Sequence, residues 1–221
     1  MRETPAGPSG PPVHGIIGAV AGAQHKTVSK GERTRERIVE RAIERFGSSG
    51  FRATSLAAIA REVGITAAAI YPYFATKEQL FVAAAEVDLD RLVGEAEAAG
   101  AASATPWLTF LQELVAALDR HPLAVRILTE GPRELTDELL ALGPLRRIGE
   151  RLRADLGAAQ TAGIVRRDID AGLLATALET VVLALLTAVH TNGLGAQPER
   201  RQALAALFLA ATLPARGAAP D

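Results

Sequence analysis

The segment from Tyr71 to Lys77 brings together side chains that suit the binding of an anion. Two phenol hydroxyls, on Tyr71 and Tyr73, flank Pro72, and the ammonium group of Lys77 follows shortly after. Phenol hydroxyls and lysine side chains donate hydrogen bonds to phosphate oxygens. Backbone N–H groups at the start of a helix, where Lys77 is expected, favour an anion as well. The spacing therefore points to contacts with phosphates, although Tyr71 could also pack in part against the protein.

Patterns that support catalysis or metal binding are not found in this sequence. The chain has no cysteine, which excludes disulfides, thiolate metal sites and a cysteine nucleophile. The four histidines, at positions 14, 25, 121 and 190, are too scattered to suggest a metal site. There is no Ser/His/Asp arrangement and no glycine-rich phosphate loop. We therefore expect no metal, no cofactor and no enzymatic activity.

The composition indicates one large or two small domains built from helices. The chain has 221 residues, of which 48% are hydrophobic but only 4% aromatic. Alanine and leucine dominate, so the residues favour helices over strands. No run of about 18 uninterrupted apolar residues predicts a membrane span. The start has only Arg2 as a basic residue before an apolar patch, unlike a secretory signal. We expect a cytoplasmic protein with no membrane partner.

Charge is distributed unevenly along the chain, although the net charge is only −1. Residues 26–80 carry a net charge of +4, whereas residues 81–221 carry −5. A basic front part attached to an acidic body suggests an anionic partner for the front part alone. The asymmetry could equally arise from ordinary variation along solvated helix faces.

Helices on either side of the tyrosines are expected to hold them in place. A helix at 32–48 has one apolar stripe and should end at Gly47 and Gly50. A later helix should begin at Lys77, because Thr76 and Gln79 have the spacing of a capping box. Residues 1–30 are rich in Gly, Pro and Ala without a period, which is typical of a disordered arm.

Two short helices lie between these longer ones. One is expected at 56–63, with Thr54 or Ser55 as its cap and Gly64 as its stop, and the other at 67–73, with Thr66 as its N-cap. Two short helices joined by a tight turn, behind a supporting helix, make a helix-turn-helix. The second helix of that motif enters the major groove of DNA, and its neighbours contact the backbone.

The helix expected at 67–73 offers few groups for reading bases. Thr66, Ala67 and Ala68 should face the base edges, but the helix has no Arg, Asn, Gln or Lys. Our hypothesis is that specificity depends largely on DNA shape and on Arg52 or residues 26–35. The expected DNA contacts are Thr54, Ser55, Thr66, Ala67, Ala68, Tyr71, Tyr73 and Lys77.

Residues 35–81, RERIVERAIERFGSSGFRATSLAAIAREVGITAAAIYPYFATKEQLF, resemble the DNA-binding domain of the TetR family of transcriptional repressors. The shared points are a helix ending in phenylalanine, Gly-Phe, Thr-Ser-x-x-x-Ile-Ala, Gly-Ile-Thr, Ile-Tyr-x-Tyr-Phe and Thr-Lys-Glu-x-Leu. The departures are Ala75, where proline or a polar residue is more usual, and Pro72 between the tyrosines.

The resemblance implies an all-α protein with two helical domains behind the arm. Residues 31–80 would form a three-helix helix-turn-helix DNA-binding domain. Residues 81–221 would form a larger ligand-binding and dimerisation domain, where the resemblance is weaker. The implied partners are double-stranded DNA with a palindromic operator, a second copy in a homodimer, and a small ligand that releases the DNA.

Capping signals divide the second half into further helices. Pro106 and Pro122 should each open one, because proline suits the first position of a helix. Further helices are expected at 134–142, 145–162, 171–191 and 198–213.

Some side chains of these helices could line a ligand pocket. Trp107 and Phe110 are one turn apart and form either pocket walls or plain core. Glu179, Thr187 and His190 lie on one very apolar helix, where polar groups need partners. They either face a ligand or have buried or interfacial partners. A pocket rich in alanine and leucine would favour a fairly large apolar molecule.

Apolar residues of the last two expected helices are candidates for a dimer interface in a four-helix bundle. The alternative is that they form an intrachain core. The candidates are Leu183, Leu186, Leu204, Leu207, Phe208 and Ala211.

The leading hypothesis is a ligand-responsive transcriptional repressor, and an activator stays open because sequence does not encode promoter position. The alternative is an apolar-ligand-binding helical protein, which could be enzymatic, with a non-functional DNA-binding domain. The intact Tyr71, Tyr73 and Lys77 argue against that loss.

Overall fold

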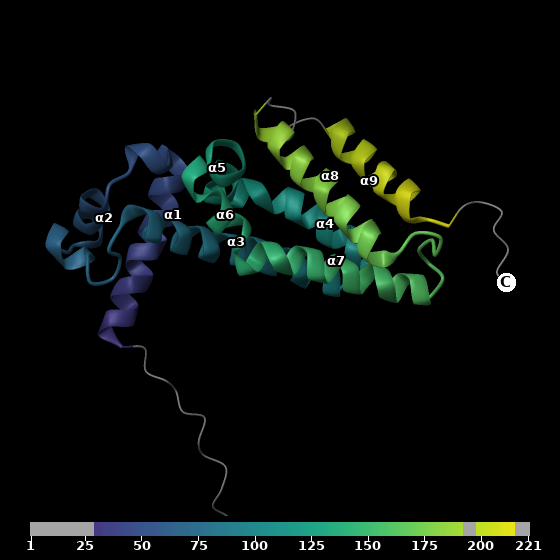
Figure 1. Cartoon of the computed structure of the whole chain (residues 1–221), viewed down its shortest axis with the longest axis horizontal. Coiled ribbons are helices and arrows are strands. Elements are labelled where there is room, and N and C mark those ends of the chain that lie inside the picture. The colour runs from purple at the N-terminus through teal and green to yellow at the C-terminus, as the bar shows by residue number, and fades with distance from the viewer. Residues whose placement is uncertain (1–28, 192–197, 215–221) are drawn as a thin grey trace, which may run out of the picture.

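The computed structural model describes residues 29–191 and 198–214, whose regular elements are all helices (Figure 1). Side chains are described for these residues except 185–191, 198, 200, 201, 204 and 205. The all-α fold expected from the sequence is confirmed. The expected arm lies outside the described residues as far as residue 28. Its last two residues, Ser29 and Lys30, instead form the N-cap and the first residue of the first helix.

At the front of the chain two short helical elements lie between two long helices, as the capping signals predict. The elements are α1 (Lys30–Ala53), α2 (Leu56–Val63), the 3₁₀ turn η1 (Ala67–Ile70) and α3 (Lys77–Ala101). Ser55, Thr66 and Thr76 are the N-caps, and each side chain accepts a hydrogen bond from a backbone N–H three residues on. Gly64 ends α2 in the left-handed conformation, which glycine adopts without a steric penalty.

Two of these helices differ from the predicted ranges. α1 does not end at Gly47, but its regular helix is interrupted at Gly50, as expected, where φ is 78° and ψ is 170°, and it resumes up to Ala53. The helix expected at 67–73 is a 3₁₀ turn over residues 67–70, followed by turns up to residue 73. Pro72 explains the second difference, because it has no N–H to donate and its ring clashes with a carbonyl one turn earlier.

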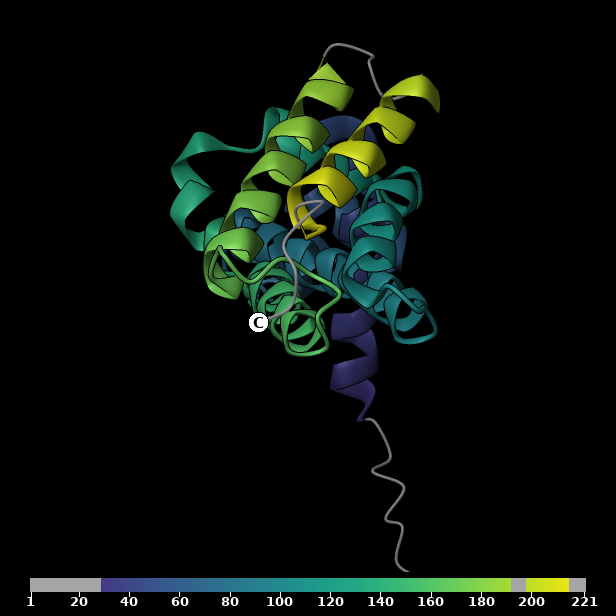
Figure 2. The same cartoon turned by 90° about the vertical axis from the view of Figure 1, so that its right-hand side faces the viewer.

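The second half contains further helices, several of which pack along α3. They are α4 (Pro106–Ala117), η2 (Leu118–Arg120), α5 (Pro122–Glu130), η3 (Arg133–Leu135), α6 (Thr136–Leu140), α7 (Gly143–Thr161), α8 (Ala171–Thr191) and α9 (Pro198–Thr212). α3 contacts α1 near its start and α4 and α7 farther along. α8 and α9 lie side by side along one face of the molecule (Figures 1 and 2).

A buried polar cluster fixes the start of α5 against α3. One oxygen of Asp88 accepts a hydrogen bond from the backbone N–H of Ala124 at 3.0 Å, and the other lies 3.0 Å from Nδ1 of His121. Both side chains are buried. The sequence analysis missed this cluster. Its only signal is an acidic residue on the buried stripe of α3, where a carboxylate requires partners.

α1 and α5 meet at Gly47. A Cβ atom at this position would lie 3.1 Å from the backbone nitrogen of Leu123 and 3.2 Å from the Pro122 side chain. Arg126 of α5 donates hydrogen bonds to the carbonyls of Gly47 and Ser48, each at 3.1 Å. Gly47 therefore serves a close helix contact between the front and the second half, and does not mark a helix end.

Gly47→Ala should destabilise the fold, because the added methyl group must push α5 away from α1. Overpacking of this kind costs about 1–3 kcal/mol, more than the alanine gains in helix propensity. Urea unfolding followed by circular dichroism measures the change. Gly94→Ala is the matched control, since nothing lies within 4 Å of a Cβ there. It should be neutral or stabilising by up to about 1 kcal/mol. Equal stability of Gly47→Ala and the unchanged protein would contradict the close contact.

Candidate DNA interface and ligand cavity

The segment around η1 presents a polar threonine and three alanines outward. The Thr66 hydroxyl caps η1 by accepting from the N–H of Ala69 at 3.2 Å, and residues 66–69 are all exposed. Ile70 and Phe74 point the other way and are buried in the core. The cap and the two buried side chains thus fix which face of the segment a partner can reach.

The three side chains around Pro72 have different surroundings. Tyr71 is 55% exposed, so its hydroxyl is free to meet a partner, whereas Tyr73 is half-buried against the core. Lys77 donates a hydrogen bond to the backbone carbonyl of Phe51 at 3.1 Å, and its ammonium lies 4.2 Å from the centre of the Phe51 ring. Lys77 therefore also ties the start of α3 to the end of α1.

Thr54 and Ser55, which were expected to act alike, point to different environments. The Thr54 side chain is buried and donates to the carbonyl of Gly50 at 2.8 Å, so it supports the kink in α1. Ser55 is exposed and caps α2 by accepting from the N–H of Ala58 at 3.2 Å. Only Ser55 of this pair is open to a partner.

Arginines of α1 hold α2 and η1 in place. The guanidinium of Arg35 lies 5.0 Å from the centre of the Phe74 ring, at a distance typical of a cation–π contact. Arg37 donates to the carbonyl of Val63 at 2.6 Å, at the end of α2. These residues belong to the basic stretch seen in the sequence. Part of that charge therefore serves the fold of the front and is not available to a partner.

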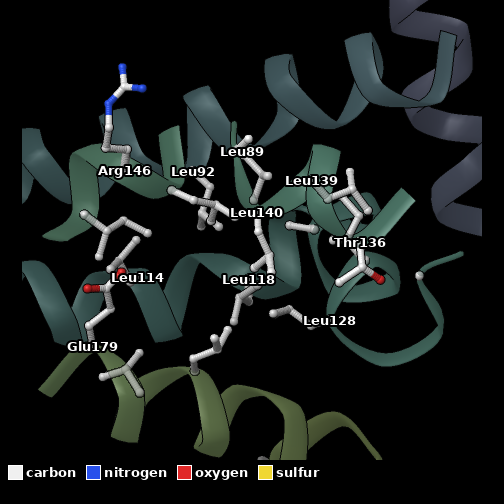
Figure 3. A pocket seen from close by; sticks show the side chains of 18 of the residues that line it. Leu89, Leu92, Leu114, Leu118, Leu128, Thr136, Leu139, Leu140, Arg146 and Glu179 are labelled. Atoms are coloured by element: carbon white, nitrogen blue, oxygen red, sulfur yellow. The ribbon is translucent and has the colours of Figure 1, made fainter. Parts of the chain in front are cut away.

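A cavity of about 700 Å³ lies in the second half of the chain, among helices α3 to α8 (Figure 3). Its walls are mostly leucine and other aliphatic side chains, and this size is usual for a small-molecule site. Its residues include Leu89 and Leu92 of α3, Leu111 and Leu114 of α4, Leu118 of η2, Ile127 and Leu128 of α5, Leu139 and Leu140 of α6, Ile148 of α7, and Val182 and Leu183 of α8.

Few polar side chains line the cavity. Arg146 points away from it in Figure 3 and pairs with the exposed Glu150 at 3.3 Å. The carboxylate of Glu179, on α8, is directed toward Leu114. Burial raises the pKa of Glu179 above its usual value, and the nearby Arg153 opposes this in part. The cavity thus combines an apolar interior with a carboxylate at one end.

The expected pocket residues are only partly brought together. Glu179 lines the cavity, whereas Trp107 and Phe110 are fully buried in the core and are not among its lining residues. Trp107 borders a separate, smaller hollow. The side chains of Thr187 and His190 lie outside the described residues. The leucines of the cavity were not singled out from the sequence, because a leucine that faces a cavity has the same helical spacing as one in a filled core.

The candidates for a dimer interface also separate into groups. Leu183 and Leu207 are exposed, at 44% and 54%, although Leu183 also borders the cavity. Phe208 is buried within the chain, and Ala211 is half-buried. The side chains of Leu186 and Leu204 lie outside the described residues.

Comparison with known proteins identifies the front of the chain. The model of the family described as bacterial regulatory proteins, tetR family, matches residues 38–84, which run from α1 into α3. The chain is also 31% identical over 157 residues to the probable acrEF/envCD operon repressor of Escherichia coli (strain K12), covering 66% of this chain and 70% of that protein. The chain belongs to the tetR family. It is a transcriptional regulator with a DNA-binding helix-turn-helix, as the sequence resemblance suggested.

Other relatives agree with this membership. The HTH-type transcriptional regulator BetI of Rhizobium meliloti (strain 1021) is 37% identical over 86 residues, but this match spans only 39% of the chain and 40% of that protein. A solved structure described as the molecular basis for control of antibiotic production by a bacterial hormone is 26% identical, with a TM-score of 0.66. It covers 82% of this chain and 98% of its own. The SmeT–triclosan complex shares the fold, with 23% identity, a TM-score of 0.64 and 86% and 98% coverage.

The described residues form neither a membrane span nor a metal site. No helix within 29–191 and 198–214 is long and apolar enough to cross a membrane. In the same ranges, no group of three or more His, Asp or Glu side chains could hold a metal ion.

At neutral pH the Glu179→Gln variant should be more stable than the unchanged chain. At acid pH the two proteins should be equally stable. Because the pKa of Glu179 is raised in the folded protein, its carboxylate lowers stability as the pH rises through that pKa. Thermal unfolding midpoints at pH values of about 4 and 7.5 test this. The gain from glutamine should appear only at the higher pH, because the carboxyl is protonated in both states when the pH is low.

Glu150→Gln removes the same charge from an exposed position of α7 and should show no comparable gain. A gain of the same size at both pH values would mean that the Glu179 charge is not the cause.

Proposed function

We propose that the protein is a repressor that binds a palindromic operator as a homodimer and is released by a small, mostly apolar ligand. The observation that carries this proposal is the position of α5. One side of α5 lines the cavity through Ala124, Ile127 and Leu128. The other side is clamped to α1 by Arg126 and by the close approach at Gly47.

The cavity and the DNA-binding front thus share one short helix. A ligand that binds one arrangement of α5 better than another shifts the population of both. α1 would move with α5, and α1 holds α2 and η1 through Arg35 and Arg37. Because the two copies of a dimer must span successive major grooves of DNA, a small rotation of each front would weaken binding.

The repressor role is supported by the relative from Escherichia coli, which is described as a probable operon repressor. The SmeT–triclosan complex, which shares the fold, supports a small-molecule ligand, because its name gives a complex with triclosan. An apolar ligand is supported by the aliphatic walls of the cavity in this chain.

The DNA contacts divide into bases and phosphates. Thr66, Ala67 and Ala68 would face base edges from the exposed side of η1, with the Thr66 hydroxyl and the alanine methyl groups as the available contacts. Such a surface reads few bases directly, so DNA shape and residues such as the exposed Arg52 would supply much of the specificity.

Phosphate contacts would come from the edges of the same surface. Tyr71 and Ser55 are open to a phosphate in this structure, and Tyr73 would offer its hydroxyl from a half-buried ring. Lys77 would act in part through its position at the start of α3, since its ammonium already binds the Phe51 carbonyl. Thr54 would support the kink behind this surface, because its hydroxyl is engaged with Gly50.

DNA binding tests the proposal directly. The purified protein should shift one discrete palindromic fragment from the DNA around its own gene. Its affinity should fall steeply with salt, because each neutralised phosphate releases a counterion. A folded protein without sequence preference, on this DNA and in a genome-wide selection, would favour the alternative of a ligand-binding protein with a non-functional DNA-binding domain. Transcription from the bound promoter, measured with and without the protein, separates repression from activation.

Tyr71→Phe should weaken binding to that fragment by about 2- to 10-fold, because it removes one hydrogen bond to a phosphate. Its thermal unfolding midpoint should not change, since the side chain is 55% exposed. Fluorescence anisotropy with labelled DNA measures the effect. Thr161→Val, which removes an exposed hydroxyl at the end of α7, is the control and should bind like the unchanged protein. Unchanged affinity in Tyr71→Phe would remove this residue from the interface.

Leu207→Glu should convert the proposed dimer to a monomer. The side chain is 54% exposed in the single chain and would be buried between copies, where an unpaired carboxylate is costly. Light scattering after size-exclusion chromatography measures the mass. Ile164→Glu, at an equally apolar position that is 49% exposed before α8, should remain dimeric. A dimeric Leu207→Glu variant would place the interface elsewhere.

A further inference from the structure

We propose that the cavity selects ligands that present a hydrogen-bond donor to the carboxylate of Glu179, and that it rejects carboxylates. This inference rests on the ligand-binding role proposed above and specifies the chemistry of the ligand. It is carried by the position of one acidic side chain at the end of an otherwise aliphatic cavity (Figure 3).

The carboxylate of Glu179 lacks a partner within the part of the chain that the structure describes. Among the described residues, no hydrogen bond or ion pair reaches its carboxylate, and Arg153 acts on it only at longer range. A carboxylate that has lost water to its surroundings without gaining a partner is costly, as the raised pKa of Glu179 reflects. A ligand that donates a hydrogen bond to it would relieve this cost, so binding energy is available at this point.

The neighbouring helix makes room for the carboxylate. Gly149 of α7 lies beside it, and a Cβ atom at that position would be only 2.9 Å from Oε2 of Glu179. With glycine there, no Cβ atom of α7 crowds the carboxylate, so Glu179 can hold its position in the wall of the cavity.

No other side chain of the cavity would serve an anionic ligand. Arg146, the basic residue in the lining, points away and pairs with Glu150. Thr136 lies at the opposite end of the cavity from Glu179 in Figure 3. An anionic head group near Glu179 would meet a like charge in surroundings of low polarity, where repulsion is strong. A protonated amine would be favoured most and a neutral hydroxyl less, because hydrogen bonds between charged groups are the stronger ones.

The test uses three probes with the same ten-carbon chain: decylamine, decanol and decanoate. Isothermal titration of the full chain at a pH of about 7.5 compares their affinities and stoichiometries. The unchanged protein should bind one decylamine per chain at least about 10-fold more tightly than decanoate, which corresponds to about 1.4 kcal/mol. Decanol should lie between them. If decanol equals decylamine, the carboxylate recognises a donor regardless of charge, and the inference stands.

Two variants locate the cause of the preference. Glu179→Gln should lose the preference for decylamine over decanoate, whereas Glu86→Gln, which removes a charge from an exposed position of α3 outside the cavity, should keep it. Thermal unfolding confirms that both variants are folded. A preference for decanoate, or a preference for decylamine that survives in Glu179→Gln, would overturn the inference, as would failure of all three probes to bind.

The experiment distinguishes failure of the proposed role of Glu179 from failure of the proposed release of DNA by a ligand. If the three probes bind equally well and release the operator fragment, the regulatory role stands and the role of Glu179 fails. If decylamine binds through Glu179 but leaves the DNA complex intact, the ligand chemistry stands and release by ligand fails.

Discussion

The close contact between α1 and α5 is the constraint on which the rest of the structure depends. At Gly47 the two helices approach so closely that a methyl group would meet the backbone of Leu123, and Arg126 bonds two carbonyls of α1 across the junction. The start of α5 is fixed to α3 in turn by the buried Asp88 and His121. Because a close-packed interior transmits strain, a shift of α5 would act on the helices packed on both of its sides. The cavity on one side of α5 and the DNA-binding front on the other are thereby connected.

In the same front, some side chains stabilise the backbone through hydrogen bonds and others are exposed on the surface. Thr54 and Lys77 both satisfy carbonyls near the end of α1, and together they hold the kink from which α2 departs. Ser55, Thr66 and Tyr71 remain exposed on the resulting surface. The tetR family model spans these residues, which agrees with the DNA contacts proposed above. The shortage of long polar side chains on this surface is consistent with a protein that depends on the shape of its DNA as much as on base contacts.

The sequence predicted most of the front because its signals there are local. Hydroxyl caps at Ser55, Thr66 and Thr76 and the glycine after α2 act within one helical turn, so they can be read without knowledge of the fold. The cavity could not be predicted in this way. Whether a leucine faces a filled core or a hollow depends on helices far apart in the chain, and Trp107, the most conspicuous aromatic residue, lies in the core. Gly47 shows the same limit, since a close contact between distant helices looks like a helix stop.

The measurement that tests the central claim most directly is amide hydrogen exchange of the full chain with and without saturating decylamine. Exchange reports local opening along the backbone. If the cavity and the DNA-binding front are coupled through α5, exchange should change at residues 44–53 of α1 as well as around the cavity, and Arg126→Ala should abolish the change in α1 while leaving the one at the cavity. A change that stays within the cavity helices in the unchanged protein would contradict the account.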